Sequence, residues 1–178
     1  SVTVESGAGL QADIPDQAFK DAGAEIAASR SGALTGADIV LKVQGPDTGE
    51  LSDFPKDAYL IAMLNPFGAP DLVQAYADKG ISSFAMEFMP RITRAQSMDV
   101  LSSQSNLAGY KAVLDACSEY GRVLPMMMTA AGTIPAAKVF IMGAGVAGLQ
   151  AVATAKRLGA IVTATDVRSA SKEQVESL

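Results

Sequence analysis

Short apolar runs alternate with segments of helical spacing along the first half of the chain. The apolar runs span residues 2–6, 38–44, 58–64 and 81–88, and the helical pattern spans residues 16–23 and 70–80. Such alternation is typical of a parallel sheet covered by helices, which predicts an α/β fold. Pro15 and Pro70 support the two helices, because proline is favoured in the first turn of a helix.

A longer helix is predicted over residues 97–121, where apolar side chains recur at helical spacing. Proline, glycine and small residues follow in the segment 124–138, a composition typical of a boundary between domains. We therefore expect an N-terminal α/β lobe over residues 1–123, with the helix as a link, and a second lobe over residues 124–178.

The second lobe begins with an apolar strand, a glycine-rich turn, a helix and a second strand. The turn has the spacing G-x-G-x-x-G, with Gly143, Gly145 and Gly148. In dinucleotide-binding folds these glycines allow a tight turn, a close approach of the backbone to a pyrophosphate, and close packing of helix on strand. The helix also directs its free N–H groups and positive dipole end at the phosphates. A tight turn without a ligand is the alternative interpretation.

Asp166 follows Gly143 by 23 residues, at the end of the second strand. An acidic side chain at this distance accepts hydrogen bonds from the adenosine ribose hydroxyls and repels a 2′-phosphate. The strand, turn, helix and acid together predict an NAD(H) site and favour NAD over NADP. Because the fold needs about six parallel strands and only two follow Lys138, we expect this Rossmann lobe to be incomplete.

Composition narrows the possible partners of the chain. Its 178 residues carry a net charge of −5 without a long basic run, which argues against binding to nucleic acid. No apolar stretch reaches the ~18 residues of a membrane-spanning helix, so we expect a soluble segment on the cytoplasmic side.

Histidine is absent from the sequence. General acid or base catalysis near neutral pH, Ser-His-Asp hydrolysis and most zinc sites therefore lose their usual residue, and we expect no metal site. Any chemistry would depend on carboxylates, lysine, arginine or a bound cofactor.

Residues 89–112 are unusually polar for a segment that leads into a buried helix. Gln96, Asp99 and Ser102 follow one another at intervals of three, which predicts that they share one face of that helix. Arg91 and Arg94 precede them, where the helix dipole gives cations no benefit. Polar residues placed against local preference indicate a ligand site. A solvated face with an ion pair between Arg94 and Asp99 is the alternative.

Three blocks of sequence closely resemble one protein family. They read PRITRAQSMDVLSSQSNLAGYKA at 90–112, MMMTAAGT at 126–133, and GAGVAGLQAVATAKRLGA at 143–160 followed by ATDVR at 164–168. They resemble the NAD(H)-binding part of the alpha subunit of proton-translocating NAD(P) transhydrogenases, within the alanine dehydrogenase and transhydrogenase family. The resemblance covers nearly the whole chain and implies two Rossmann-like lobes with parallel sheets.

The resemblance also implies which residues form the site. Those that match the nicotinamide end in the family are Arg91, Gln96, Asp99 and Ser102. Those that match the pyrophosphate and adenosine contacts are Gly143, Gly145, Val146, Ala147, Gly148, Asp166 and Val167. Thr129 to Gly132 matches a loop that lines the cleft.

Family members pass a hydride from NADH to NADP(+) held on a separate domain, and couple this to proton movement through a membrane domain. The resemblance therefore implies NAD(H) on this chain, NADP(H) on a partner domain, and a beta subunit that carries the partner and membrane domains. It also implies a homodimer at the cytoplasmic side, peripheral to the inner membrane.

Two other functions are open at this point. Alanine dehydrogenase has a similar architecture, and Lys42 resembles its substrate-binding lysine. The alternative for Lys42 is a purely structural ion pair at the end of a strand. That enzyme also needs a histidine where this chain has Leu64 and Asn65. The third hypothesis is a non-catalytic NAD-binding module, which the polar stretch at 89–112 argues against.

Overall fold

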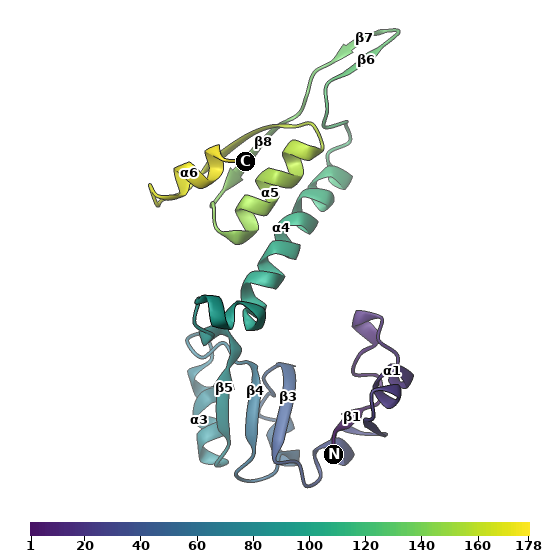
Figure 1. The fold of residues 1–178 in the computed structure, drawn as a ribbon, viewed down its shortest axis with the longest axis vertical. Helices are drawn as coiled ribbons and strands as arrows, with labels where there is room; N and C mark the ends of the chain where they lie inside the picture. Colours follow the sequence, from purple (N-terminus) through teal and green to yellow (C-terminus); the bar gives the residue numbers. More distant parts are fainter. The chain divides into compact units, whose positions relative to one another are not determined.

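The computed structural model describes residues 1–178, which form two compact units, Ser1–Gln96 and Ser97–Leu178 (Figure 1). Both units contain parallel strands joined by helices, so the predicted α/β class is confirmed. The division into lobes between residues 123 and 124 stays a prediction. The compact units place the segment 97–123 with the C-terminal side instead.

Two parallel sheets build the N-terminal unit. Strands β1 (Thr3–Glu5) and β2 (Glu25–Ala27) form the smaller sheet, and β3 (Ile39–Gln44), β4 (Tyr59–Met63) and β5 (Ser82–Ala85) form the larger one in that order. The helices are α1 (Asp16–Asp21), α2 (Arg30–Leu34) and α3 (Pro70–Asp78). Short 3₁₀ segments span Leu10–Ala12, Glu50–Asp53, Met86–Phe88 and Thr93–Met98.

The core of this unit is packed against one face of the larger sheet. Val40, Leu60 and Ala62 are buried while their neighbours in the strands are more exposed, as expected from the alternation of side chains along a strand. Tyr76 from α3 is fully buried in the same cluster, and its hydroxyl donates a 2.7 Å hydrogen bond to the carbonyl oxygen of Pro46. This bond fixes the loop that follows the carboxyl end of β3.

The C-terminal unit contains one βαβ element and the long helix α4 (Val100–Glu119). Strands β8 (Lys138–Met142) and β9 (Ile161–Thr165) are parallel and are joined by α5 (Val146–Arg157). A hairpin of β6 (Met127–Thr129) and β7 (Gly132–Ile134) precedes them, and α6 (Ser171–Glu176) follows.

Helix α4 packs closely on α5 (Figure 1). Gly109 is buried at the contact, where an added Cβ would lie only 2.0 Å from the carbonyl oxygen of Ala147. A side chain of any size would therefore separate the two helices. The helix predicted as a link is thus part of the packing around the glycine turn.

The elements predicted from the sequence are present, with ends that differ by a few residues. The helix predicted over 97–121 spans Val100–Glu119. Five short helices and strands were missed, namely β2, α2, α6 and the two strands of the hairpin, β6 and β7. Each has only three to six residues per helix or strand, too few for a periodic pattern to emerge.

Candidate functional site

The glycine turn joins the carboxyl end of β8 to the start of α5. Gly143 has φ of +96°, a left-handed conformation that favours glycine, and its N–H donates to the carbonyl oxygen of Thr165 at 2.7 Å. Gly148 lies in the first turn of α5, where an added Cβ would be 1.8 Å from the carbonyl oxygen of Gly143. The motif therefore serves a tight turn at its first glycine and close helix packing at its last.

Space is open beside the first two glycines of the motif. No heavy atom lies within 4 Å of a Cβ placed at Gly143 or Gly145. Gly145 is the N-cap of α5, so Val146, Ala147 and Gly148 present the N–H groups of the first helical turn. An anion such as a pyrophosphate fits this arrangement, because the backbone is accessible and the helix dipole favours negative charge.

Asp166 follows β9 and ties it to the glycine turn. Its Oδ2 accepts a 2.6 Å hydrogen bond from the N–H of Ala144, and its side chain is only 9% exposed. The guanidinium of Arg168 and the N–H groups of Ala144 and Arg168, in that order, hold the pKa of Asp166 well below its ordinary value of 3.8. The carboxylate is therefore ionised and rigidly placed at the edge of the turn.

Asp99 and Ser102 meet at the start of α4, but not in the way the sequence predicted. Asp99 is the N-cap of the helix, and its carboxylate accepts bonds from the N–H of Ser102 at 2.9 Å and from its hydroxyl at 2.6 Å. Gln96 lies in the preceding 3₁₀ segment. The expectation that all three share one face of an α-helix is therefore wrong, because the cap begins a new helix at Val100.

The remaining predicted residues lie in other parts of the chain. Arg91 and Gln96 are exposed and belong to the N-terminal unit. Thr129 and Gly132 form the turn of the hairpin, where the Thr129 hydroxyl donates to the Gly132 carbonyl at 2.8 Å. All residues of this hairpin are exposed, and it extends away from β8 and α5 (Figure 1). Val167 is fully exposed.

Glu87 organises the carboxyl end of the larger sheet, a role that the sequence did not reveal. Its carboxylate accepts hydrogen bonds from the N–H groups of Leu64, at 2.9 and 3.1 Å, and of Asn65, at 2.5 Å. Asn65 has φ of +47° and is held in this left-handed conformation by the bond. Partial burial alone would raise the pKa of Glu87, but the backbone donors outweigh it and lower the pKa below 4.5.

Glu87→Gln is expected to destabilise the N-terminal unit by about 1–2 kcal/mol near neutral pH, because a neutral amide is a weaker acceptor than a carboxylate. The lowered pKa means that Glu87 stabilises the fold above pH 4.5, the ordinary value, and that this contribution disappears as the pH falls through the folded-state pKa. Denaturant unfolding at pH 7 and pH 3 measures both effects. Glu25→Gln is the matched control, since Glu25 is exposed and its carboxylate makes no hydrogen bond in the structure.

A gap in stability between variant and native protein that does not shrink from pH 7 to pH 3 would contradict this role for the Glu87 carboxylate.

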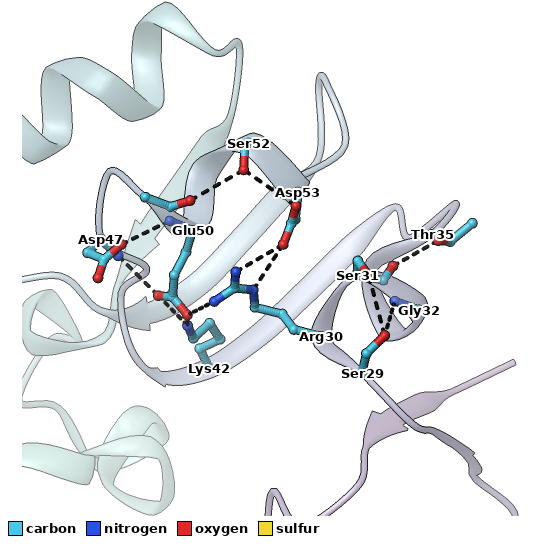
Figure 2. Close-up of polar contacts among 11 residues, drawn as sticks. Ser29, Arg30, Ser31, Gly32, Thr35, Lys42, Asp47, Glu50, Ser52 and Asp53 are labelled. Atoms are coloured by element: carbon cyan, nitrogen blue, oxygen red, sulfur yellow. Dashed lines mark hydrogen bonds and ion pairs between the residues drawn. The ribbon is translucent and has the colours of Figure 1, made fainter.

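Lys42 is ion-paired within its own chain (Figure 2). Its Nζ donates to both carboxylate oxygens of Glu50, at 2.9 and 3.0 Å, and Arg30 donates to the same carboxylate at 2.9 Å. Arg30 also pairs with Asp53. The bonds from Lys42 lower the pKa of Glu50 most, against the opposing effect of burial. The salt-bridged strand end is thus what the structure contains.

Two further contacts at the site were missed from the sequence. Arg168 binds Asp166 with two N–H groups of its guanidinium, and Ala144 contributes its backbone N–H. The short spacing from Asp166 to Arg168 was the one available signal, because oppositely charged residues two apart in a loop can meet. Nothing in the sequence marked Ala144, since a backbone donor carries no side-chain signature.

No helix of the structure combines the length and the apolar character required to span a bilayer. The structure also contains no group of three or more Cys, Asp or Glu side chains placed to hold a metal ion.

Comparison with known proteins finds a matching family model for each half of the chain. Residues 1–108 match the family model "Alanine dehydrogenase/PNT, N-terminal domain", and residues 112–178 match the model "Alanine dehydrogenase/PNT, C-terminal domain". The chain is 56% identical to an NAD(P) transhydrogenase subunit alpha polypeptide of Rhodospirillum rubrum, an alignment that covers 99% of this chain and 47% of that protein. It is 30% identical to alanine dehydrogenase of Bacillus subtilis, again over 99% of this chain and 47% of the relative.

Solved structures agree with these matches. The transhydrogenase from Sinorhizobium meliloti superposes with a TM-score of 0.92 at 61% identity, over 99% of this chain and 53% of that one. An L-alanine dehydrogenase superposes with a TM-score of 0.81 at 28% identity, over 99% and 49% of the two chains. The chain therefore spans about half the length of the relatives it matches. Both family models and both structures lead to one conclusion: the chain belongs to the alanine dehydrogenase/PNT family.

Proposed function

We propose that this chain is the NAD(H)-binding component of a proton-translocating transhydrogenase, in which a hydride passes directly between NADH and NADP(+) held on a partner domain. The observation that carries the proposal is the open glycine turn with Asp166 at its edge, in a chain 56% identical to an NAD(P) transhydrogenase subunit alpha polypeptide. The geometry of the turn fits a dinucleotide, and the sequence identity to the transhydrogenase relative supports hydride transfer as the reaction.

The adenosine half of the proposed site is built from the glycine turn and the end of β9. Gly143 and Gly145 leave the backbone open to a pyrophosphate, and the N–H groups of Val146, Ala147 and Gly148 would face its charge. Asp166 would accept hydrogen bonds from the ribose hydroxyls. Val167, fully exposed beside it, would flank the adenosine.

The nicotinamide half is assigned to Arg91, Gln96, Asp99 and Ser102. The Ser102 hydroxyl donates a hydrogen bond to the Asp99 carboxylate, so the lone pairs of its oxygen would accept a hydrogen bond from the carboxamide N–H₂. Arg91 would donate to the carboxamide oxygen, and Asp99 would orient Arg91 or the ring. Gln96 would steady a ribose or reach toward the second nucleotide. The hairpin turn from Thr129 to Gly132 would line the cleft.

The absence of histidine is compatible with this reaction. When bound, the nicotinamide ring supplies the hydride, and both electrons leave with it. No proton is donated or accepted at the reacting carbons, so the chain needs no general acid or base. Its side chains contribute orientation and electrostatics, by which the two rings would be held at reacting distance.

The proposed partners follow from the same assignment. A beta subunit would supply the NADP(H)-binding domain and the membrane domain, and this chain would act as a homodimer on the cytoplasmic side, peripheral to the inner membrane. The word "subunit" in the names of the transhydrogenase relatives supports assembly with other chains.

A hydride-transfer assay tests the proposed function. The intact protein is mixed with an NAD analogue and NADPH, with and without the NADP(H)-binding partner. We expect reduction of the analogue only when the partner is present. Alanine-dependent formation of NADH without the partner would instead establish an alanine dehydrogenase. The ion pair of Lys42 with Glu50 argues against that outcome, because the charge of the lysine is already paired with a carboxylate of its own chain.

Asp166→Ala is expected to weaken NADH binding by about 10- to 100-fold, the loss of charge-assisted hydrogen bonds worth about 1.5–3 kcal/mol. Fluorescence titration of the intact protein with NADH measures the dissociation constant. Asp166→Asn retains one acceptor oxygen, so its NADH affinity is expected to lie between those of the native protein and Asp166→Ala. Native affinity in Asp166→Ala, with an unchanged unfolding midpoint, would remove Asp166 from the proposed site.

A further inference from the structure

The carboxylate of Asp166 already receives four hydrogen-bond donors from its own chain. Oδ2 accepts from the N–H of Ala144 at 2.6 Å and from Nη2 of Arg168 at 3.1 Å. Oδ1 accepts from the backbone N–H of Arg168 at 2.8 Å and from its Nε at 3.0 Å. Because an ionised carboxylate offers about four lone-pair sites, its acceptor capacity is filled.

Only two of these four donors can leave without disturbing the backbone. The N–H of Ala144 is fixed inside the glycine turn, and the N–H of Arg168 belongs to the loop that follows β9. The guanidinium is carried by a side chain that is 62% exposed, whereas the side chain of Asp166 is 9% exposed. Because the guanidinium half of this ion pair is exposed, solvent or a ligand can replace it more easily than either backbone donor.

We propose that Arg168 is a displaceable occupant of the carboxylate that receives the adenosine ribose, and that it weakens the preference of the site for NAD(H) over NADP(H). The inference rests on the proposed function, which places a ribose at Asp166. Two ribose hydroxyls need two acceptor sites, and these are the sites filled by Nε and Nη2. The guanidinium must therefore move away when the adenosine end binds.

The displaced guanidinium would still lie close to the 2′ position of the ribose, because it is only two residues from Asp166. There it would partly offset the repulsion between the Asp166 carboxylate and a 2′-phosphate. Arg168 would thus have two effects of opposite sign. It would weaken NADH binding by competing with the ribose hydroxyls for the carboxylate oxygens of Asp166. It would strengthen NADPH binding by placing a cation near the 2′-phosphate.

Protonation does not provide an alternative way to free the carboxylate. The pKa of Asp166 is lowered, first by the side chain of Arg168 and then by the N–H groups of Ala144 and Arg168. The carboxylate stays ionised at any pH near neutrality. The competition is therefore between two sets of donors, the guanidinium and the ribose hydroxyls.

The test compares Arg168→Ala and Arg168→Lys with the native intact protein, by titration with NADH and with NADPH at low and high salt. For Arg168→Ala we expect NADH to bind about two- to five-fold more tightly at low salt, the factor expected for loss of a partly exposed ion pair. NADPH should bind less tightly. Arg168→Lys keeps the charge but not the paired N–H groups, so its NADH affinity should lie between the two.

Salt gives a second readout that a purely structural role would not produce. The guanidinium half of the ion pair between Arg168 and Asp166 is exposed, so its attraction to the carboxylate is partly screened at high salt, and the gap in NADH affinity between native protein and Arg168→Ala should shrink. Thermal unfolding of both variants should match the native protein, because the guanidinium lies on the surface.

Unchanged or weaker NADH binding by Arg168→Ala would overturn the inference, and so would an unchanged ratio of NADH to NADPH affinity. These results would leave the proposed function intact as long as the native protein binds NADH. Failure of the native protein to bind NADH would instead overturn the proposed function, and this inference with it.

Discussion

Gly148→Ala is expected to destabilise the C-terminal unit by about 3 kcal/mol or more and to abolish NADH binding. A Cβ at this position would lie 1.8 Å from the carbonyl oxygen of Gly143 and 2.8 Å from its carbonyl carbon. Both atoms are backbone, so no side chain can rotate to relieve the contact. Either α5 must move away from β8 or the turn must open, and each change removes the anion site. Denaturant unfolding and NADH titration measure the two effects.

Gly145→Ala is the matched control, the same substitution at another glycine of the motif. No heavy atom lies within 4 Å of a Cβ at Gly145, and its φ of −78° is accessible to alanine. We expect a change in stability below about 1 kcal/mol, the size of a glycine-to-alanine change at an N-cap. NADH affinity should nevertheless fall at least tenfold, since the methyl group would occupy the space assigned to the pyrophosphate. Native NADH affinity in Gly145→Ala would mean that no phosphate approaches this face.

Arg91→Ala is expected to slow hydride transfer by about 10- to 1000-fold while changing NADH affinity far less. Loss of one contact that positions a reacting group costs about 1–4 kcal/mol in the transition state. The adenosine half of the proposed site lies in the C-terminal unit and retains its own contacts, so binding should survive. Single-turnover transfer in the assembled enzyme, with NADH titration alongside, separates the two effects.

Arg94→Ala provides a control with the same change of charge, since Arg94 is also exposed and lies only three residues further along the chain. Its transfer rate should stay within a few-fold of native. Equal rates for Arg91→Ala and the native protein would remove Arg91 from the nicotinamide end.

Asp99 requires a different substitution, because it has a structural role as well. Its carboxylate caps α4, and loss of a cap costs about 1 kcal/mol of stability. Asp99→Ser keeps an oxygen that can accept from the N–H of Ser102 but removes the charge. Slow transfer with native stability in this variant would assign the charge itself to the reaction.

The sequence alone determined the βαβ element of the C-terminal unit. The left-handed φ at Gly143, the start of α5 after Gly145 and the acid at the end of β9 are all properties of one continuous segment. Local backbone preferences and the period of apolar residues encode such features directly. The same reasoning predicted four strands of the N-terminal unit, β1, β3, β4 and β5, and its helices α1 and α3, where each element has its own apolar pattern or its own turn residues.

Only the tertiary structure decided which side chains meet. Gly109 lies against Ala147, Glu87 holds the backbone after β4, and Arg168 fills the acceptors of Asp166. The sequence also suggested that Gln96, Asp99 and Ser102 share a helical face, whereas Gln96 lies in a 3₁₀ segment that ends at Met98 and Asp99 caps the helix that follows. Spacing along the chain gives the direction of a side chain within one element. It does not give the position at which two elements approach each other, because that depends on how all the elements pack together.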